Sequence, residues 1–440
     1  MKNRHFNYNR KRSRMELMKR GILPMNAIEK IIATHAGLKT VKPGQIVDVT
    51  LDYVMANDAT TTLAIDVFKK ELKGERVFDR EKVVLVMDHY TPCCSVDAAE
   101  THKKMRQFGR DQKLKYVYDG VGVCHQLMLE HHAKPGDFII GADSHTCTYG
   151  AIGALSTGMG STDVAVGWME GKVWIKVPSA IKIIVSGKWP MGVYSKDLIL
   201  KVIGDLTAKG ASYKALVFEG EAIRDLTISE RATLCNMGIE AGAKFAYVQP
   251  DEKVKAFMKE MGREYYPVIE ADEDASYERI LTYNVADLEP QIAYPHSVDQ
   301  VKPLSDFAGL EIDEVFLGAC TNGRFEDLET AAAILKGKRI SDKVRMLVTP
   351  ASNAVYMEAM KRGLIRTFIE SGAMVSPPGC SACFGGTIGI IGPGERLLTT
   401  ANRNFKGRVG SPDGEIYLAS PATAAASALY GKITDPRKVI

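Results

Sequence analysis

No run of apolar residues in this 440-residue sequence reaches the roughly 18 to 20 residues of a membrane-spanning helix, so we expect no bilayer crossing. The first 24 residues also lack the apolar stretch of a secretory signal. The eight cysteines therefore belong to a chain without a sign of secretion, where disulfides are rare and paired cysteines serve metal binding or catalysis. We expect a cytoplasmic protein.

An excess of charge of one sign is confined to the beginning of the chain. Residues 1–24 hold eight lysines or arginines and one acid, Glu16, whereas the formal net charge of the whole chain is +4. The remaining residues carry about −3, so the chain lacks the overall basic face that nucleic-acid binding requires. We predict that residues 1–24 form a disordered extension or that the protein begins at Met25. The arginines of this segment also weakly resemble those of an organelle transit peptide.

The composition, with 45% apolar and 25% charged residues, is typical of a globular protein, and the length predicts two to three domains. From Asn26 onward, β-rich runs alternate with helical patterns, which predicts α/β layers with largely parallel sheets. Strands are expected at 82–87, 138–141, 181–186, 315–317 and 344–348, and helices at 96–108, 122–132, 196–207, 229–237 and 328–335. A middle region, roughly 178–295, contains a charged surface stretch and is expected to be a second domain.

Polar residues repeatedly follow a predicted strand directly. Asp88-His89, Asp143-Ser144-His145 and Cys320-Thr321-Asn322 each occupy such a position. Ligand sites in α/β folds lie at the carboxyl ends of strands, so this placement favours function over packing. His131 and His132, at a predicted helix end, are expected to cap the helix or lie at the surface. His5, His35 and His102 have no predicted role.

The cysteines also point to a site. Cys380 and Cys383 form the chain's C-x-x-C motif, which by itself could be half a zinc site, a redox pair or coincidence. No second C-x-x-C supplies the four ligands of a structural zinc site. Together with Cys320, also in a loop of small residues, the pair suits an iron–sulfur cluster in which one iron stays open as a Lewis acid. Cys235 is expected to pack in a helix, and Cys93, Cys94, Cys124 and Cys147 to form buried walls of the site.

Seven segments, taken in order, resemble the aconitase superfamily over nearly the whole chain after Met25. They are MDHYTP (87–92), GVCHQ (122–126), IIGADSHTCTYGAIGALSTGMGSTD (139–163), ATLCNMGIEAGA (232–243), GACTNGR (318–324), PPGCSACFGG (377–386) and ANRNFKGR (401–408). The resemblance implies an α/β fold of three α/β/α domains around a [4Fe–4S] cluster, one per chain. We expect these domains at 25–178, 179–295 and 296–440.

The resemblance also implies roles for single residues. Cys320, Cys380 and Cys383 would hold the cluster, with one iron not ligated by protein. The catalytic set would be Asp88, His89, His125, Asp143, His145 and Glu240, and the substrate-binding set Ser144, Asn236, Asn402, Arg403 and Arg408. Asn236 and Glu240 lie four positions apart, which places both on one face of a helix.

The chemistry of these residue types agrees with that assignment. Loss of water from a 2-hydroxy acid needs an acid at a poor leaving group, and a carboxylate–imidazole pair such as Asp88 and His89 can hold that acid in one tautomer. Arginine suits a substrate carboxylate because its planar fork binds two oxygens.

The sequence also departs from single-chain aconitases. Those enzymes carry a fourth, swivelling domain with the catalytic base, a serine beside an arginine, whereas this chain ends at Ile440. We expect a small subunit of the swivel-domain type to complete the site, in a heterodimer or heterotetramer, and no nucleic-acid or membrane partner. Thr62 stands about where aconitase has a substrate-binding glutamine, which argues against citrate.

Among two-component relatives we expect a 3-isopropylmalate dehydratase, which converts 2-isopropylmalate to 3-isopropylmalate through 2-isopropylmaleate in leucine biosynthesis. Homoaconitase, a citramalate isomerase and 2,3-dimethylmalate dehydratase have the same large-subunit motifs and stay open as alternatives. An RNA-binding iron sensor would show basic stripes and a longer single chain, which this sequence lacks.

Overall fold

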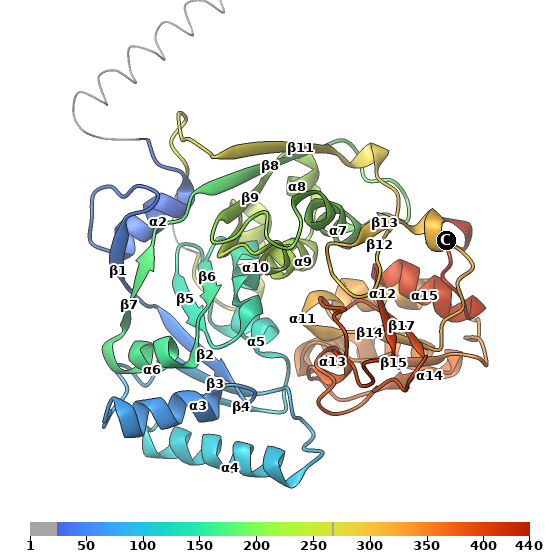
Figure 1. The fold of residues 1–440 in the computed structure, drawn as a ribbon, viewed down its shortest axis with the longest axis horizontal. Coiled ribbons are helices and arrows are strands. Elements are labelled where there is room, and N and C mark those ends of the chain that lie inside the picture. Colours follow the sequence, from blue (N-terminus) through green and yellow to red (C-terminus); the bar gives the residue numbers. More distant parts are fainter. Residues whose placement is uncertain (1–23, 266–267) are drawn as a thin grey trace, which may run out of the picture.

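The computed structural model of the chain describes residues 24–265 and 268–440, in which three β-sheets are flanked by helices (Figure 1). The prediction for the basic start of the chain falls, apart from Pro24, outside these residues. Within the described ranges, no helix combines the length and apolar character that crossing a membrane requires.

The first sheet is entirely parallel, with the strand order β4-β3-β2-β5-β6. Its strands are β2 (Tyr53–Asn57), β3 (Val83–Met87), β4 (Tyr116–Asp119), β5 (Phe138–Gly141) and β6 (Leu155–Gly158). The surrounding helices are α2 (Ala27–His35), α3 (Thr61–Asp66) continued by the π-helix η1 (Val67–Glu71), α4 (Val96–Asp111), α5 (Cys124–His131), the 3-10 helix η2 (Ser144–Ile152) and α6 (Ser161–Glu170). Every residue of β3 is buried, as expected of a parallel strand covered on both faces.

The second sheet is also parallel, in the order β10-β9-β8-β11. It consists of β8 (Ala180–Ser186), β9 (Ala215–Glu219), β10 (Phe245–Val248) and β11 (Arg279–Asn284). Its helices are α7 (Ser195–Leu206), α8 (Glu221–Asp225), α9 (Ile228–Met237), η3 (Gly238–Ala241), α10 (Glu252–Glu260) and η4 (Val285–Asp287). A capping box between Thr227 and Glu230 fixes the start of α9.

The third sheet has the order β13-β12-β18-β17-β14-β15-β16, and only the pairings of β12 are antiparallel. Its strands are β12 (Gln291–Ala293), β13 (Val301–Pro303), β14 (Glu314–Leu317), β15 (Arg345–Val348), β16 (Met374–Val375), β17 (Arg396–Thr399) and β18 (Glu415–Leu418). Its helices are η5 (Leu304–Phe307), α11 (Ala319–Asn322), α12 (Phe325–Leu335), α13 (Asn353–Lys361), α14 (Leu364–Ser371), η6 (Ser381–Cys383), α15 (Pro421–Tyr430) and η7 (Pro436–Lys438).

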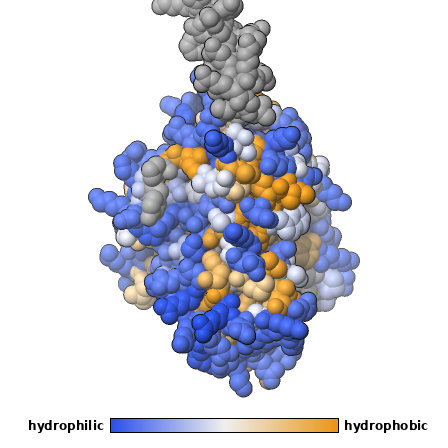
Figure 2. All heavy atoms as spheres, turned by 90° about the vertical axis from the view of Figure 1, so that its left-hand side faces the viewer, coloured by the Kyte–Doolittle hydropathy of each residue, from blue (hydrophilic) through white to orange (hydrophobic). Residues whose placement is uncertain are grey.

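A separate antiparallel ribbon of β1 (Ile46–Thr50) and β7 (Lys172–Lys176) lies at the left of Figure 1. Ile46 and Trp174 point outward from it and are 66% and 59% exposed. Figure 2, which looks at this side of the molecule, shows an apolar band on an otherwise hydrophilic face.

The expected parallel α/β architecture is confirmed, and all five predicted strands and all five predicted helices are present with ends shifted by at most three residues. The three domain boundaries stay a prediction, although each sheet draws its strands from one of the three expected ranges.

One apolar cluster connects the three sheets. It includes Met55 of the first sheet, Ile183 of the second and Phe316 of the third. The backbone N–H of Val123, just before α5, donates to the carbonyl of Ala351, just after β15. These contacts hold the carboxyl ends of β3, β5 and β14 around one volume.

Candidate active site

Side chains from loops that follow β3, β5 and β14 line a cavity of about 230 Å³. Eleven of the fourteen predicted site residues lie on its wall, and the other three, Asp88, Asn236 and Glu240, hydrogen-bond to residues of that wall. The wall consists of Ala59, Thr60, His89, His125, Ala142, Asp143, Ser144, His145, Cys320, Cys380, Cys383, Phe384, Asn402, Arg403 and Arg408. The fold therefore brings the whole predicted set to one place.

Three free cysteines share this cavity. Cys320 lies in the short helix α11 after β14, and Cys380 and Cys383 lie at the two ends of η6. Gly318 is required before Cys320, because a Cβ there would lie 2.8 Å from the carbonyl oxygen of Thr349. Each cysteine residue is 5% exposed, so its sulfur can reach a group in the cavity without facing bulk water.

The surroundings of the sulfurs suit thiolate ligands. The side-chain amide of Asn236 donates to Sγ of Cys320 at 3.2 Å, and that of Asn402 donates to the same sulfur at 3.6 Å. N–H donors aimed at sulfur stabilise its negative form. Burial nevertheless raises the pKa of Cys320 to about 12 and that of Cys380 well above its usual value. A metal ion bound to the sulfurs would supply the missing positive charge, so the residues present fit a metal–sulfur centre.

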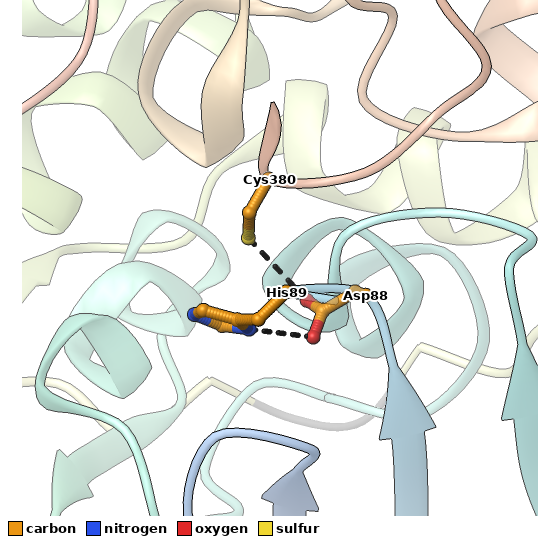
Figure 3. Close-up of side chains that lie close together, drawn as sticks. All are labelled: Asp88, His89 and Cys380. Atoms are coloured by element: carbon orange, nitrogen blue, oxygen red, sulfur yellow. Dashed lines mark hydrogen bonds and ion pairs between the residues drawn. The ribbon is translucent and has the colours of Figure 1, made fainter. Parts of the chain in front are cut away.

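Asp88 and His89 form the pair expected at the end of β3. Oδ1 of Asp88 lies 2.7 Å from Nδ1 of His89, and its Oδ2 accepts from the backbone N–H of Cys124. Figure 3 shows the carboxylate of Asp88 between His89 and Cys380, whose sulfur is 3.8 Å from Oδ2. Burial alone would lower the pKa of His89, but Cys380 and Asp88 raise it well above its usual value. The imidazole therefore favours the protonated form.

Asp143 organises a second acid–base pair after β5. Its Oδ1 lies 2.8 Å from Nε2 of His125 and accepts the backbone N–H of His145 at the same distance. Nδ1 of His125 lies 3.1 Å from the hydroxyl of Tyr149. Burial opposes ionisation of Asp143, yet His125 and His145 hold its pKa well below the usual range. The carboxylate thus fixes the orientation of one imidazole and of the loop that bears the other.

A third group of hydrogen bonds connects Glu240 with the cavity wall. Oε1 of Glu240 lies 2.7 Å from Nε2 of His145 and accepts from Nε of Arg403 at 2.8 Å. Nη2 of Arg403 donates to Oγ of Ser144 at 2.9 Å. Asn236 and Glu240 both reach the site, although a change from α9 to the 3-10 helix η3 separates them. Arg403 is thereby held with its guanidinium beside the cavity.

Arg408 completes the predicted substrate-binding set. Its guanidinium lies 5.4 Å from the ring centroids of both Phe384 and Phe405. Its Nε is buried without a hydrogen-bond partner in the structure. A donor in this state can still bind an anion in the cavity that it lines.

Sequence reasoning missed several supporting residues. The buried Arg324 donates to the carbonyls of Cys320 and Thr321 and to Oε1 of Gln126, next to His125. Asp58 accepts the backbone N–H groups of His89 and Tyr90. Arg324 was visible as the last residue of the GACTNGR segment, but nothing local indicated Asp58.

Some expectations were wrong. Cys93 and Cys94, in the loop between β3 and α4, are exposed rather than buried. Cys124 and Cys147 are buried as expected but do not line the cavity, and Cys235 is buried in α9 as expected. His132 is the C-cap residue of α5, which confirms one of the two alternatives given for it, although it is buried. His102, for which no role was predicted, has two side-chain partners, Asp58 and Cys93. Thr60 lines the cavity and Thr62 does not, and the argument against citrate from Thr62 stays a prediction.

Comparison with known proteins agrees with this geometry. The sequence profile of the aconitase family (aconitate hydratase) matches residues 29–311 and 305–431. The chain is 47% identical to the 3-isopropylmalate dehydratase large subunit 1 of Pyrococcus furiosus, over 94% of this chain and 99% of that one. It is 48% identical to the proteins of the same name from Methanopyrus kandleri, over 93% and 98% of the two chains, and Archaeoglobus fulgidus, over 94% and 99%.

Among solved structures, the holo-form of Thermococcus kodakaraensis aconitase X is similar in fold. Its TM-score is 0.51 at 13% sequence identity, and the match covers 86% of this chain and 89% of that one. The profile match spans nearly all of the described residues, including every segment that lines the cavity. The chain therefore belongs to the aconitase family.

Proposed function

We propose that this chain is the large subunit of a hydro-lyase that interconverts 2-isopropylmalate and 3-isopropylmalate through 2-isopropylmaleate, a reaction of leucine biosynthesis. The relatives with 46–48% identity over nearly the full length are named as large subunits of 3-isopropylmalate dehydratase. The observation that carries the proposal is the shared cavity, whose wall holds three free thiols, three histidines that each pair with a carboxylate, and two arginines.

The family implies an iron–sulfur cluster. In our proposal this is a [4Fe–4S] cluster held by Cys320, Cys380 and Cys383, with Asn236 and Asn402 donating toward the sulfur of Cys320. When bound, the cluster supplies a Lewis acid, because three protein ligands leave one of its four irons free for substrate oxygens.

His89 is the proposed proton donor to the departing hydroxyl. Asp88 engages its Nδ1, so Nε2 is the atom that can deliver a proton toward the cavity. Asp88 also accepts the N–H of Cys124, which prevents its carboxylate from turning away. The raised pKa of His89 keeps that proton available at neutral pH.

Arg403 and Arg408 are the proposed anchors of the substrate carboxylates, and Ser144 contributes its hydroxyl. Glu240 and Ser144 hold Arg403 in place before substrate arrives, which reduces the ordering cost of binding. His125 with Asp143 and His145 with Glu240 then orient the substrate hydroxyl and exclude competing water.

A small subunit of the swivel-domain type is the proposed source of the catalytic base, in a heterodimer or heterotetramer. The names of the relatives as large subunits support a second chain. The cluster side of the site and the acid would thus come from this chain, and the base would come from its partner.

The test is an anaerobic assay of the cluster-loaded chain mixed with its small subunit on isopropylmalate, homocitrate, citramalate and dimethylmalate. Isopropylmalate should give the highest kcat/KM, and the large subunit alone should be inactive. If another of the four is preferred, the substrate assignment is wrong, and if none is dehydrated, the reaction class is wrong as well.

A second experiment tests the cluster ligands. Cys380→Ser should lose iron and sulfide, whereas Cys235→Ser, which changes a buried cysteine outside the cavity, should keep both.

A further inference from the structure

A cysteine, a histidine and an aspartate form a second hydrogen-bonded chain behind the candidate site. Sγ of Cys93 lies 3.2 Å from Nδ1 of His102, and Nε2 of His102 lies 2.7 Å from Oδ2 of Asp58. Asp58 follows β2, Cys93 follows β3 and His102 lies on α4, so three separate elements bring the groups together. None of the three lines the cavity of the candidate site.

The aspartate determines which nitrogen of His102 carries the proton. Burial alone would raise the pKa of Asp58, but hydrogen bonds from His102 and His89 hold it well below its usual range, so the carboxylate is ionised. An ionised carboxylate can only accept hydrogen bonds. Nε2 of His102 therefore bears a hydrogen, and in the neutral imidazole Nδ1 presents a lone pair to the sulfur of Cys93.

The thiol of Cys93 and the imidazole of His102 differ in their exposure to solvent. Cys93 is exposed, whereas His102 and Asp58 are 2% and 1% exposed. Partial desolvation raises the pKa of Cys93, against the lowering effect of Arg106, so the resting sulfur is a thiol that donates to His102. An accessible nucleophile next to a base that a third group orients is the arrangement of an activated thiol.

We propose that Cys93 is a nucleophilic thiol that reacts with small electrophiles, specifically with hydrogen peroxide, at a site distinct from the cavity. The thiol proton passes to Nδ1 of His102 while the sulfur attacks one peroxide oxygen. The O–O bond breaks, and the leaving hydroxide takes the proton back from His102 and departs as water. Cys93 is oxidised to sulfenic acid, and the peroxide is reduced.

The same aspartate connects this thiol with the loop that carries the proposed acid. Asp58 accepts the backbone N–H of His89 and of Tyr90, each at 2.9 Å. A modified Cys93 no longer presents its S–H to His102, and the added oxygen lengthens the side chain, so the chain of hydrogen bonds that supports this loop is altered at its outer end. Cys94, the next residue, instead donates to the carbonyl of Gly386 at 2.9 Å.

Cys94 provides an internal reference, since it is also exposed but donates to a backbone carbonyl and has no imidazole partner within the described part of the chain. The full-length, cluster-loaded protein is treated anaerobically at pH 7 with iodoacetamide, and peptide mass spectrometry follows each cysteine. Cys93 should react at least ten times faster than Cys94. One equivalent of hydrogen peroxide followed by a sulfenic-acid trap should label Cys93 first.

His102→Gln should lower the alkylation rate of Cys93 to that of Cys94, while His131→Gln, an exposed histidine on α5, should leave both rates unchanged. Continued protection of the buried Cys235 shows that a variant is folded. Equal rates at Cys93 and Cys94 in the unmodified sequence would overturn the proposal without any variant. An unchanged Cys93 rate in folded His102→Gln would do the same.

Discussion

Nε of Arg403 donates to Oε1 of Glu240 at 2.8 Å, although 163 positions of sequence separate the two residues. The same carboxylate oxygen lies 2.7 Å from Nε2 of His145, so one buried acid orients both a guanidinium and an imidazole. Burial opposes ionisation of Glu240, yet His145 and Arg403 lower its pKa below the usual value. The arginine is thus held rigidly at the cavity before any ligand binds.

Arg403→Lys is expected to raise KM about 30-fold, equivalent to about 2 kcal/mol, with a smaller effect on kcat. Lysine keeps the charge but cannot donate to Glu240 and Ser144 while also binding a carboxylate with two N–H groups. Steady-state kinetics of the complete enzyme measure the effect. Arg396→Lys, whose ion pair with Glu415 lies at the surface, is the matched control and should leave KM unchanged.

Arg324→Lys is expected to destabilise the chain by about 3 kcal/mol. The substitution removes hydrogen bonds to the carbonyls of Cys320 and Thr321 and leaves buried acceptors unpaired. Urea denaturation of the anaerobic protein measures the loss. Arg366→Lys, an exposed residue paired with Glu370 one turn away, should change stability by less than about 0.5 kcal/mol, and equal effects would contradict the proposed role.

His132 is expected to make folding sensitive to acid. Burial, helped by His131 and Arg263, lowers its pKa from 6.5 to about 3, and its Nδ1 is buried without a partner in the structure. Below pH 6.5 the unfolded chain binds a proton that the folded chain does not, so stability present above pH 6.5 is lost as the pH falls toward 3.

The difference at pH 5 amounts to about 2 kcal/mol, so the original protein should lose that much more stability than His132→Phe between pH 7 and pH 5. Denaturation midpoints at the two pH values measure it. His131→Phe changes the exposed neighbour and should keep most of the original pH dependence, because burial is the largest cause of the lowered pKa of His132. The same acid sensitivity in His132→Phe would contradict the assignment to His132.

Removal of the proposed cluster by anaerobic chelation is expected to lower Tm by about 5 °C or more, because a group that binds only the folded chain stabilises it. The sulfurs of Cys320, Cys380 and Cys383 should then become alkylated, since they face the cavity. Differential scanning calorimetry and mass spectrometry measure these changes. Cys235, which is fully buried outside the cavity, should remain protected, and unchanged reactivity of the other three would exclude them as ligands.

Much of the site could be predicted because its members occur in short segments. Asp88 and His89 are neighbours in the sequence, and Cys380 and Cys383 are three positions apart. The ends of the strands could be predicted equally well, since the fully buried β3 and β5 appear in the sequence as continuous apolar runs that polar residues follow directly. For such features the backbone geometry of one element is enough to place the side chains.

The sequence by itself thus determined the α/β class, the family and eleven of the residues that line the cavity. Only the tertiary structure decided that Cys93 is exposed, that His102 joins it to Asp58 and that Arg403 is held by Glu240. Apolar periodicity reports which face of an element is buried but not which polar group of another element lies against it. The hydrogen bonds of His102 with Asp58 and of Arg403 with Glu240 span 44 and 163 positions of sequence. Such contacts, like the exposure of Cys93, depend on how helices and sheets pack, which no short sequence segment specifies.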